Sequence, residues 1–165
     1  MKHLLTIVLI TFSQLTTFSQ INIRPTDPKQ LGEIVFKSFQ DENYELFLKY
    51  IFTEADCDTL AKNADAPDSL KITAVEQMKN RTNYIRQTSK ENFELIISIG
   101  KQNGIDWKET KLSDVLFEIK SNENVQQSDI FLLCEYKDKI FLIKLDDCHK
   151  SDSWLMMGNA EIQFK

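Results

Sequence analysis

Glycine is scarce in this chain of 165 residues, which contains only four. Dinucleotide-binding and phosphate-binding loops need closely spaced glycines, because the backbone must turn tightly and approach the phosphates. No such spacing occurs, and the Gly-x-Ser-x-Gly and His-Glu-x-x-His motifs are absent as well. The sequence therefore disfavours nucleotide-dependent enzymes and the commonest classes of hydrolase and protease.

Histidine is scarcer still: the chain has two, and only His149 lies beyond the N-terminal region. Its neighbours within residues 146–150 include aspartates and a cysteine, and an imidazole there can act as a general base or a metal ligand. However, adjacent strand residues point to opposite faces, and no second histidine or Cys-x-x-Cys completes a zinc set. We therefore expect His149 to lie in a solvated turn. For the protein as a whole we expect no metal, no cofactor and no catalytic residue. A nucleophilic pair of His149 with Cys57 or Cys134 has only composition in its favour.

The chain also lacks clusters of positive charge. Its formal net charge is −5, and no group of Lys and Arg residues is interleaved with aromatics, so we expect no nucleic-acid partner. Beyond residue 19 no apolar stretch approaches the roughly 20 residues of a membrane-spanning helix, so we expect no membrane insertion. Asp56 and Asp58 begin like a calcium-binding loop, but Ala61 and Pro67 replace its glycine and glutamate.

Residues 1–19 have the pattern of an export signal. Lys2 precedes the apolar run 4–12, and a polar stretch with the small residue Ser19 follows. This is the order of a signal peptide and its cleavage site, and the run is too short to span a membrane. It resembles export signals of some Gram-negative bacteria, and no cysteine follows it to carry a lipid. We expect cleavage before Gln20 and a periplasmic or secreted protein.

Three cysteines, Cys57, Cys134 and Cys148, lie after the predicted cleavage site. An oxidising compartment permits at most one intramolecular disulfide among them. Cys134 belongs to an apolar run, where a free cysteine behaves as a small hydrophobe. Cys57 and Cys148 lie in polar stretches and are the disulfide candidates, while three unpaired thiols remain the alternative.

Two tripeptides, at residues 58–60 and 68–70, resemble the Asp-Ser/Thr-apolar acceptor for O-glycosylation of exported proteins in some Gram-negative bacteria. Thr59 and Ser69 are the candidate acceptors. An aspartate before a serine is also a common helix cap, so the alternative is local structure without a glycan.

The first half of the mature chain has a helical period. Apolar residues recur at helical spacing in 31–39 and 44–51, and Asp41 is the expected cap of the second helix. Residues 53–68 are polar and acidic, which predicts a surface loop with at most a short helical turn. A long helix then begins near Ser69. It restarts at the capping box of residues 88–91 and ends near Gly104.

The second half predicts strands at 115–119, 129–136, 139–145 and 154–164, with a hairpin turn at Lys137-Asp138. The middle two strands are apolar on both faces, so both faces of the sheet should be largely covered. Residues 20–165 are therefore predicted to form a single α+β domain, with N-terminal helices packed on a C-terminal four-stranded antiparallel meander.

Two short helices, a further helix and an antiparallel meander with a tryptophan near its end resemble the cystatin-like and NTF2-like class of α+β folds. The likeness lies in the order of the elements, without a specific motif. It implies a curved sheet around an apolar pocket, in a class that includes isomerases, cyclases, binding modules and scaffolds. A pocket enzyme of this class would need a carboxylate such as Glu118 or Glu135 facing the cavity. Strand alternation instead predicts that both carboxylates face water.

The chain thus supplies a scaffold and few chemical groups at catalytic spacing. We expect a small exported binding or interaction protein without catalysis, whose partner is a small apolar ligand or another protein. Two alternatives remain open: a small pocket enzyme of the isomerase type, and an inhibitor or immunity protein that blocks an exported partner. The acidic segment 53–68 is the candidate contact region for an inhibitor.

Overall fold

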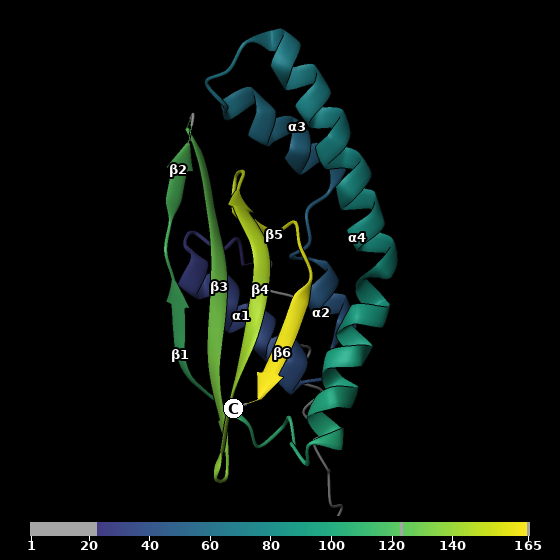
Figure 1. The fold of residues 1–165 in the computed structure, drawn as a ribbon, viewed down its shortest axis with the longest axis vertical. Coiled ribbons are helices and arrows are strands. Elements are labelled where there is room, and N and C mark those ends of the chain that lie inside the picture. The colour runs from purple at the N-terminus through teal and green to yellow at the C-terminus, as the bar shows by residue number, and fades with distance from the viewer. Residues whose placement is uncertain (1–22, 123, 165) are drawn as a thin grey trace, which may run out of the picture.

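The computed structural model describes residues 23–122 and 124–164 (Figure 1). The predicted signal peptide, residues 1–19, lies outside the described residues. The fold is α+β, with helices first and an antiparallel sheet after them, as the sequence predicts. The helices are α1 (Pro28–Gln40), α2 (Tyr44–Leu48), α3 (Glu54–Asn63) and α4 (Asp68–Gln102).

The sheet has six strands among the described residues, where the sequence predicts four. Its order is β1-β3-β4-β5, with β2 pairing β3 and β6 pairing β4. The predicted strand 154–164 is wrong as a single element, because the chain breaks at Gly158 and pairs with β4 twice. The strands are β1 (Lys111–Phe117), β2 (Lys120–Asn122), β3 (Val125–Tyr136), β4 (Lys139–Lys150), β5 (Trp154–Met156) and β6 (Ala160–Phe164).

Strands β3 and β4 form the predicted hairpin. Tyr136 pairs with Lys139 across the two-residue turn Lys137-Asp138, and Lys137 has a φ of 55°. A positive φ in the turn is what the right-handed twist of a two-residue hairpin favours. The hairpin is the longest pairing in the sheet and runs its full height in Figure 1.

Local capping explains where the first helices begin. The Asp27 carboxylate accepts a hydrogen bond from the Gln30 amide at 2.9 Å, and a proline occupies the first turn of α1. The prediction that Asp41 caps α2 is wrong, because Asp41 is the C-terminal cap of α1. Asn43 caps α2 by accepting from the Leu46 amide at 3.0 Å.

Two predictions about the middle of the chain are wrong. The segment 53–68 is mostly helix α3, which begins with a capping box between Thr53 and Asp56. Helix α4 does not restart at Thr88 but continues through it, and the Thr88 hydroxyl donates to the Tyr84 carbonyl of the preceding turn at 3.0 Å instead of capping a new helix. The result is a helical hairpin in which α3 packs on the first part of α4, at the upper end of the molecule in Figure 1, while the rest of α4 continues beside the sheet.

The sequence predicts that both faces of the sheet are largely covered, and the described helices cover one of them. Gly32 brings α1 onto this face: a Cβ there would lie 2.8 Å from side-chain atoms of Leu132 and Val115. In Figure 1 α1 lies behind the sheet, and no described helix crosses in front of β1, β3 and β4. The front face is therefore open.

The core between the helices and the sheet is filled by aromatic rings. Phe39 of α1 stacks on Phe93 of α4 with ring centroids 5.3 Å apart and contacts Trp107 at 5.8 Å. Trp107 also meets Phe141 of β4 edge-on at 6.0 Å. These rings occupy the region where the cystatin-like and NTF2-like resemblance implies a pocket, so the candidate site lies elsewhere.

None of the helices in the described ranges is both long and apolar enough to cross a membrane.

Candidate functional site

The candidate site lies where the α3–α4 hairpin meets the upper ends of β3 and β4. Three contacts hold the hairpin together: the Lys79 ammonium lies 2.7 Å from the Asp58 carboxylate, the Asn83 amide donates to Glu54 at 2.7 Å, and the Cys57 thiol meets the Thr82 hydroxyl. The first residues of β3 and the last residues of β4 lie next to this helical hairpin, and they line two separate hollows.

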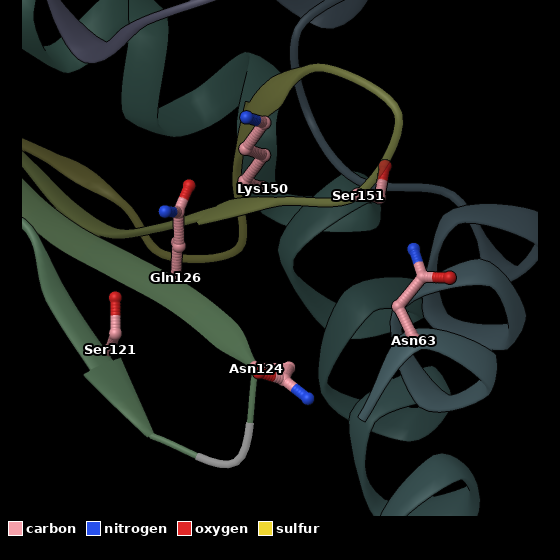
Figure 2. Close-up of a pocket in the computed structure, with 6 residues that line it drawn as sticks. All are labelled: Asn63, Ser121, Asn124, Gln126, Lys150 and Ser151. Carbon is pink, nitrogen blue, oxygen red and sulfur yellow. The ribbon is translucent and has the colours of Figure 1, made fainter. Parts of the chain in front are cut away.

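The first hollow, which we name the polar cleft, lies between the β2–β3 hairpin and the end of α3. Its volume is about 510 Å³. Figure 2 shows Ser121, Gln126 and Lys150 pointing to the same side of the strands, with Asn63 on the helix across from them. Lys150 is the only charged side chain among its lining residues, so the cleft offers hydrogen bonds but no acid–base pair. The lining residues are Asn63, Ser121, Asn124, Gln126, Lys150 and Ser151.

The second hollow, which we name the apolar hollow, has a volume of about 240 Å³. Alanines on the facing sides of α3 and α4 leave this space between the two helices. Its two polar lining residues, Lys71 and His149, are both basic. The lining residues are Leu60, Ala61, Ala64, Ala66, Leu70, Lys71, Ala74, Met78, Val125 and His149.

The prediction that His149 lies in a solvated turn is wrong. His149 belongs to β4, is 9% exposed and packs edge-on against the Phe52 ring. Its Nε2 lies 2.7 Å from Oδ1 of Asp147, whose other oxygen pairs with Arg81 of α4 at 2.6 Å. Asp147 has a φ of 52°, and its amide donates to the Asp129 carboxylate at 3.1 Å. This left-handed residue turns its side chain toward α4 instead of continuing the strand alternation.

The charge of Asp147 is stabilised by its neighbours. The hydrogen bond from His149 lowers the pKa of this carboxyl, burial opposes the shift, and the positive charge of Arg81 adds to the lowering. Asp147 is therefore ionised at neutral pH. Because a carboxylate only accepts hydrogen bonds, Nε2 of His149 carries the proton between them.

The other ring nitrogen of His149, Nδ1, is fully buried and has no hydrogen-bond partner. A general base must reach the proton that it removes, within about 3 Å or through one water. A buried Nδ1 does not meet this requirement. The Arg81–Asp147–His149 arrangement is therefore better suited to fixing the wall of the apolar hollow than to proton transfer.

The three cysteines are buried free thiols, so the structure does not contain the Cys57–Cys148 disulfide of the prediction. Burial raises the pKa of each thiol, for Cys134 to about 12. A thiol rather than a thiolate at neutral pH is a poor nucleophile. This argues against a nucleophilic pair of Cys57 or Cys134 with His149.

We expect no cysteine of the native protein to react with Ellman's reagent at neutral pH, and all three to react in denaturant. The physical reason is that each thiol is both inaccessible and protonated. Intact-mass measurement supplies the control: a mass two units below that of the reduced chain, or a denatured count of one thiol, would show that a disulfide forms.

The remaining site candidates from the sequence do not line either hollow. Glu118 and Glu135 are exposed, in agreement with strand alternation. Ser69 is exposed in the first turn of α4. The Thr59 hydroxyl donates to the Ala55 carbonyl at 3.0 Å within α3. If a glycan is present, the structure favours Ser69 as its acceptor.

Within residues 23–122 and 124–164, no three His, Cys, Asp or Glu side chains are grouped so that they could hold a metal ion. Comparison with known proteins found no match to a family model, to a curated protein or to a solved structure. The cystatin-like and NTF2-like resemblance therefore stays a prediction from the order of elements.

Proposed function

We propose that this protein is an exported, non-catalytic binding protein that holds a small, mainly apolar ligand in the apolar hollow. The observation that carries the proposal is a hollow lined by alanines and leucines, whose most buried polar lining residue, His149, is held by Asp147 and Arg81. Ligand sites are typically apolar concavities with few, well-placed polar groups.

The volume of the hollow limits the ligand. An engineered cavity of about 150 Å³ binds benzene, so about 240 Å³ accommodates a somewhat larger ring system. Leu70 is exposed at the hollow, and Leu60 is buried. A ligand that covers Leu70 would therefore bury an apolar side chain that otherwise faces water, which is favourable at roughly 25 cal/mol per Å².

The isomerase-type alternative has one observation in its favour, the buried Asp147–His149 pair beside an apolar hollow. The burial of Nδ1 argues against it. The two functions differ in a simple measurement: an enzyme of this kind would lose turnover about a hundredfold or more in His149→Gln, whereas a binding protein turns over no substrate at all. The inhibitor alternative relied on a surface loop at residues 53–68 as its contact region. Residues 54–63 form helix α3, so this argument for an inhibitor no longer holds.

Indole is a suitable probe, because it has the size that the hollow admits. We expect amide signals of residues lining the hollow, such as Ala64 and Val125, to shift in NMR spectra when indole is added. Ala64→Leu fills the hollow from the C-cap position of α3, so indole binding should weaken about tenfold or more, which is a loss of about 1.4 kcal/mol.

Ala55→Leu is the matched control, since Ala55 is exposed on α3, the helix that Ala64 caps, and does not line the hollow. It should bind indole like the wild type. The proposal fails if indole shifts no signals around the hollow, or if both leucine variants bind it equally well.

A further inference from the structure

The two hollows beside the α3–α4 hairpin take alternate residues of the same two strands. Val125 and His149 line the apolar hollow, whereas their chain neighbours Gln126 and Lys150 line the polar cleft. Successive side chains of a strand point to opposite faces, so the two sites are separated by strand alternation. The polar cleft is therefore a second concavity with its own chemistry, which the proposed function does not use.

Three polar side chains of the cleft lie in one row across the sheet. Ser121 of β2 pairs with Gln126 of β3. Gln127 pairs with His149 of β4, and one position further along this ladder Gln126 lies across from Lys150. Directly opposite residues of antiparallel strands have Cβ atoms about 4.5–5.5 Å apart on the same face. A hydroxyl, an amide and an ammonium group thus converge from three neighbouring strands, and Figure 2 shows them pointing to the same side.

The other lining residues of the cleft add polar groups without adding a charge. Asn63, the last residue of α3, lies across from the strands, and Asn124 immediately precedes β3. Ser151 is buried, and its hydroxyl donates to Oδ1 of Asp56 at 3.4 Å. The lone pairs of the Ser151 hydroxyl remain as acceptors for a ligand.

The donors and acceptors of these side chains determine which ligand the cleft fits. An amide side chain offers two donors and one acceptor oxygen, a hydroxyl offers one donor, and an ammonium offers three donors and no acceptor. The three amides, two hydroxyls and one ammonium of the lining therefore provide more donors than acceptor atoms, and one positive charge. No carboxylate belongs to the described lining residues, so the lining itself does not repel an anion.

We infer that the polar cleft binds a small hydroxylated carboxylate, which is the chemical class of a sugar acid. The ligand carboxylate accepts a charge-assisted hydrogen bond from the Lys150 ammonium. The ligand hydroxyls, which both donate and accept, form hydrogen bonds with the amides and with Ser121. The cleft volume of about 510 Å³ lies within the range of about 300–1,000 Å³ that is common for small-molecule sites.

The test is an NMR titration of the full mature chain with galacturonate, and with galactose as its uncharged counterpart. Galacturonate has a carboxylate where galactose has a hydroxymethyl group, so the comparison isolates the effect of the charge. We expect galacturonate to shift the amide signals of Ser121, Gln126 and Lys150. Galactose should bind about tenfold more weakly, which is the effect of losing one charge-assisted hydrogen bond.

A substitution of the cation tests the same contact from the side of the protein. Lys150→Gln removes the charge and keeps a hydrogen-bonding group, so it should weaken galacturonate binding about tenfold and leave galactose binding unchanged. Lys120→Gln is the matched control, because Lys120 is exposed on β2 and does not line the cleft. It changes the net charge equally and should bind galacturonate like the wild type. Circular dichroism establishes that both variants are folded.

The inference is overturned if galacturonate shifts no signals around the cleft, or if galactose binds as tightly as galacturonate. It is also overturned if Lys150→Gln binds galacturonate like the wild type, or if Lys120→Gln loses as much affinity as Lys150→Gln. These results are independent of the indole measurement, because the signals of Ala64 and Val125 report on the apolar hollow.

Discussion

Replacing Trp107 with alanine is expected to lower the free energy of unfolding by about 3–5 kcal/mol, the range for large aromatic residues in a core. Trp107 is 1% exposed and lies where α1, α4 and β4 meet, against Phe39 and Phe141. Its Nε1 donates to the Ile97 carbonyl of α4 at 3.1 Å. Alanine removes the ring contacts and also leaves this buried carbonyl without its donor.

Urea titration followed by circular dichroism measures the effect directly. The control is Tyr84→Ala, because Tyr84 is an exposed aromatic residue on α4, and its loss should change the unfolding free energy by less than about 0.5 kcal/mol. A loss below about 1 kcal/mol in Trp107→Ala would mean that the aromatic core does not hold α4 against the sheet as described.

The parts of the fold that the sequence predicts are those in which local pattern and burial agree. Leu31, Val35 and Phe39 recur at helical spacing, and all three are fully buried in α1. The apolar runs of β3 and β4 and the turn at Lys137-Asp138 follow the same logic. In these segments one short stretch of sequence determines both the element and its buried side.

The error at α3 has a physical cause that the sequence could have revealed. Its acidic residues suggest a loop, but acids are favourable in the first turn of a helix. Thr53 and Asp56 form the capping box, a motif visible in the sequence. The similar spacing at Thr88 and Glu91 does not cap anything, because Phe93 and the residues around it pack α4 continuously against the core.

The burial of His149 could not be predicted from its surroundings in the sequence. Its neighbours in the sequence are mostly polar. A glycine would have indicated a positive φ, but the residue with the positive φ at this position is Asp147. The burial comes from packing with Phe52 and the α3–α4 hairpin, which are distant in sequence. The apolar hollow depends on the same long-range packing, so the alanines that line it carry no signal by themselves.

Asp147→Asn is expected to lower the free energy of unfolding by about 1–3 kcal/mol at neutral pH. The substitution removes the charge that Arg81 and His149 face, while it keeps the size of the side chain. Asparagine also tolerates a positive φ at least as well as aspartate, so the backbone at this position is not strained further. The loss therefore reports on the charge and the one acceptor oxygen that the substitution removes, and not on the backbone.

The pH dependence of this loss identifies its origin. The folded protein holds the pKa of Asp147 below its ordinary value of about 4, so the stabilisation is fully present above that pH. It is lost as the pH falls through the lower, folded-state pKa, because the carboxyl is then protonated in both states. Urea titrations from neutral pH down to about pH 2 should show the wild type and Asp147→Asn converging. Asp138→Asn, at the exposed hairpin turn, should match the wild type throughout. A gap between wild type and Asp147→Asn that stays constant down to the lowest pH would show that the carboxylate charge does not stabilise this site.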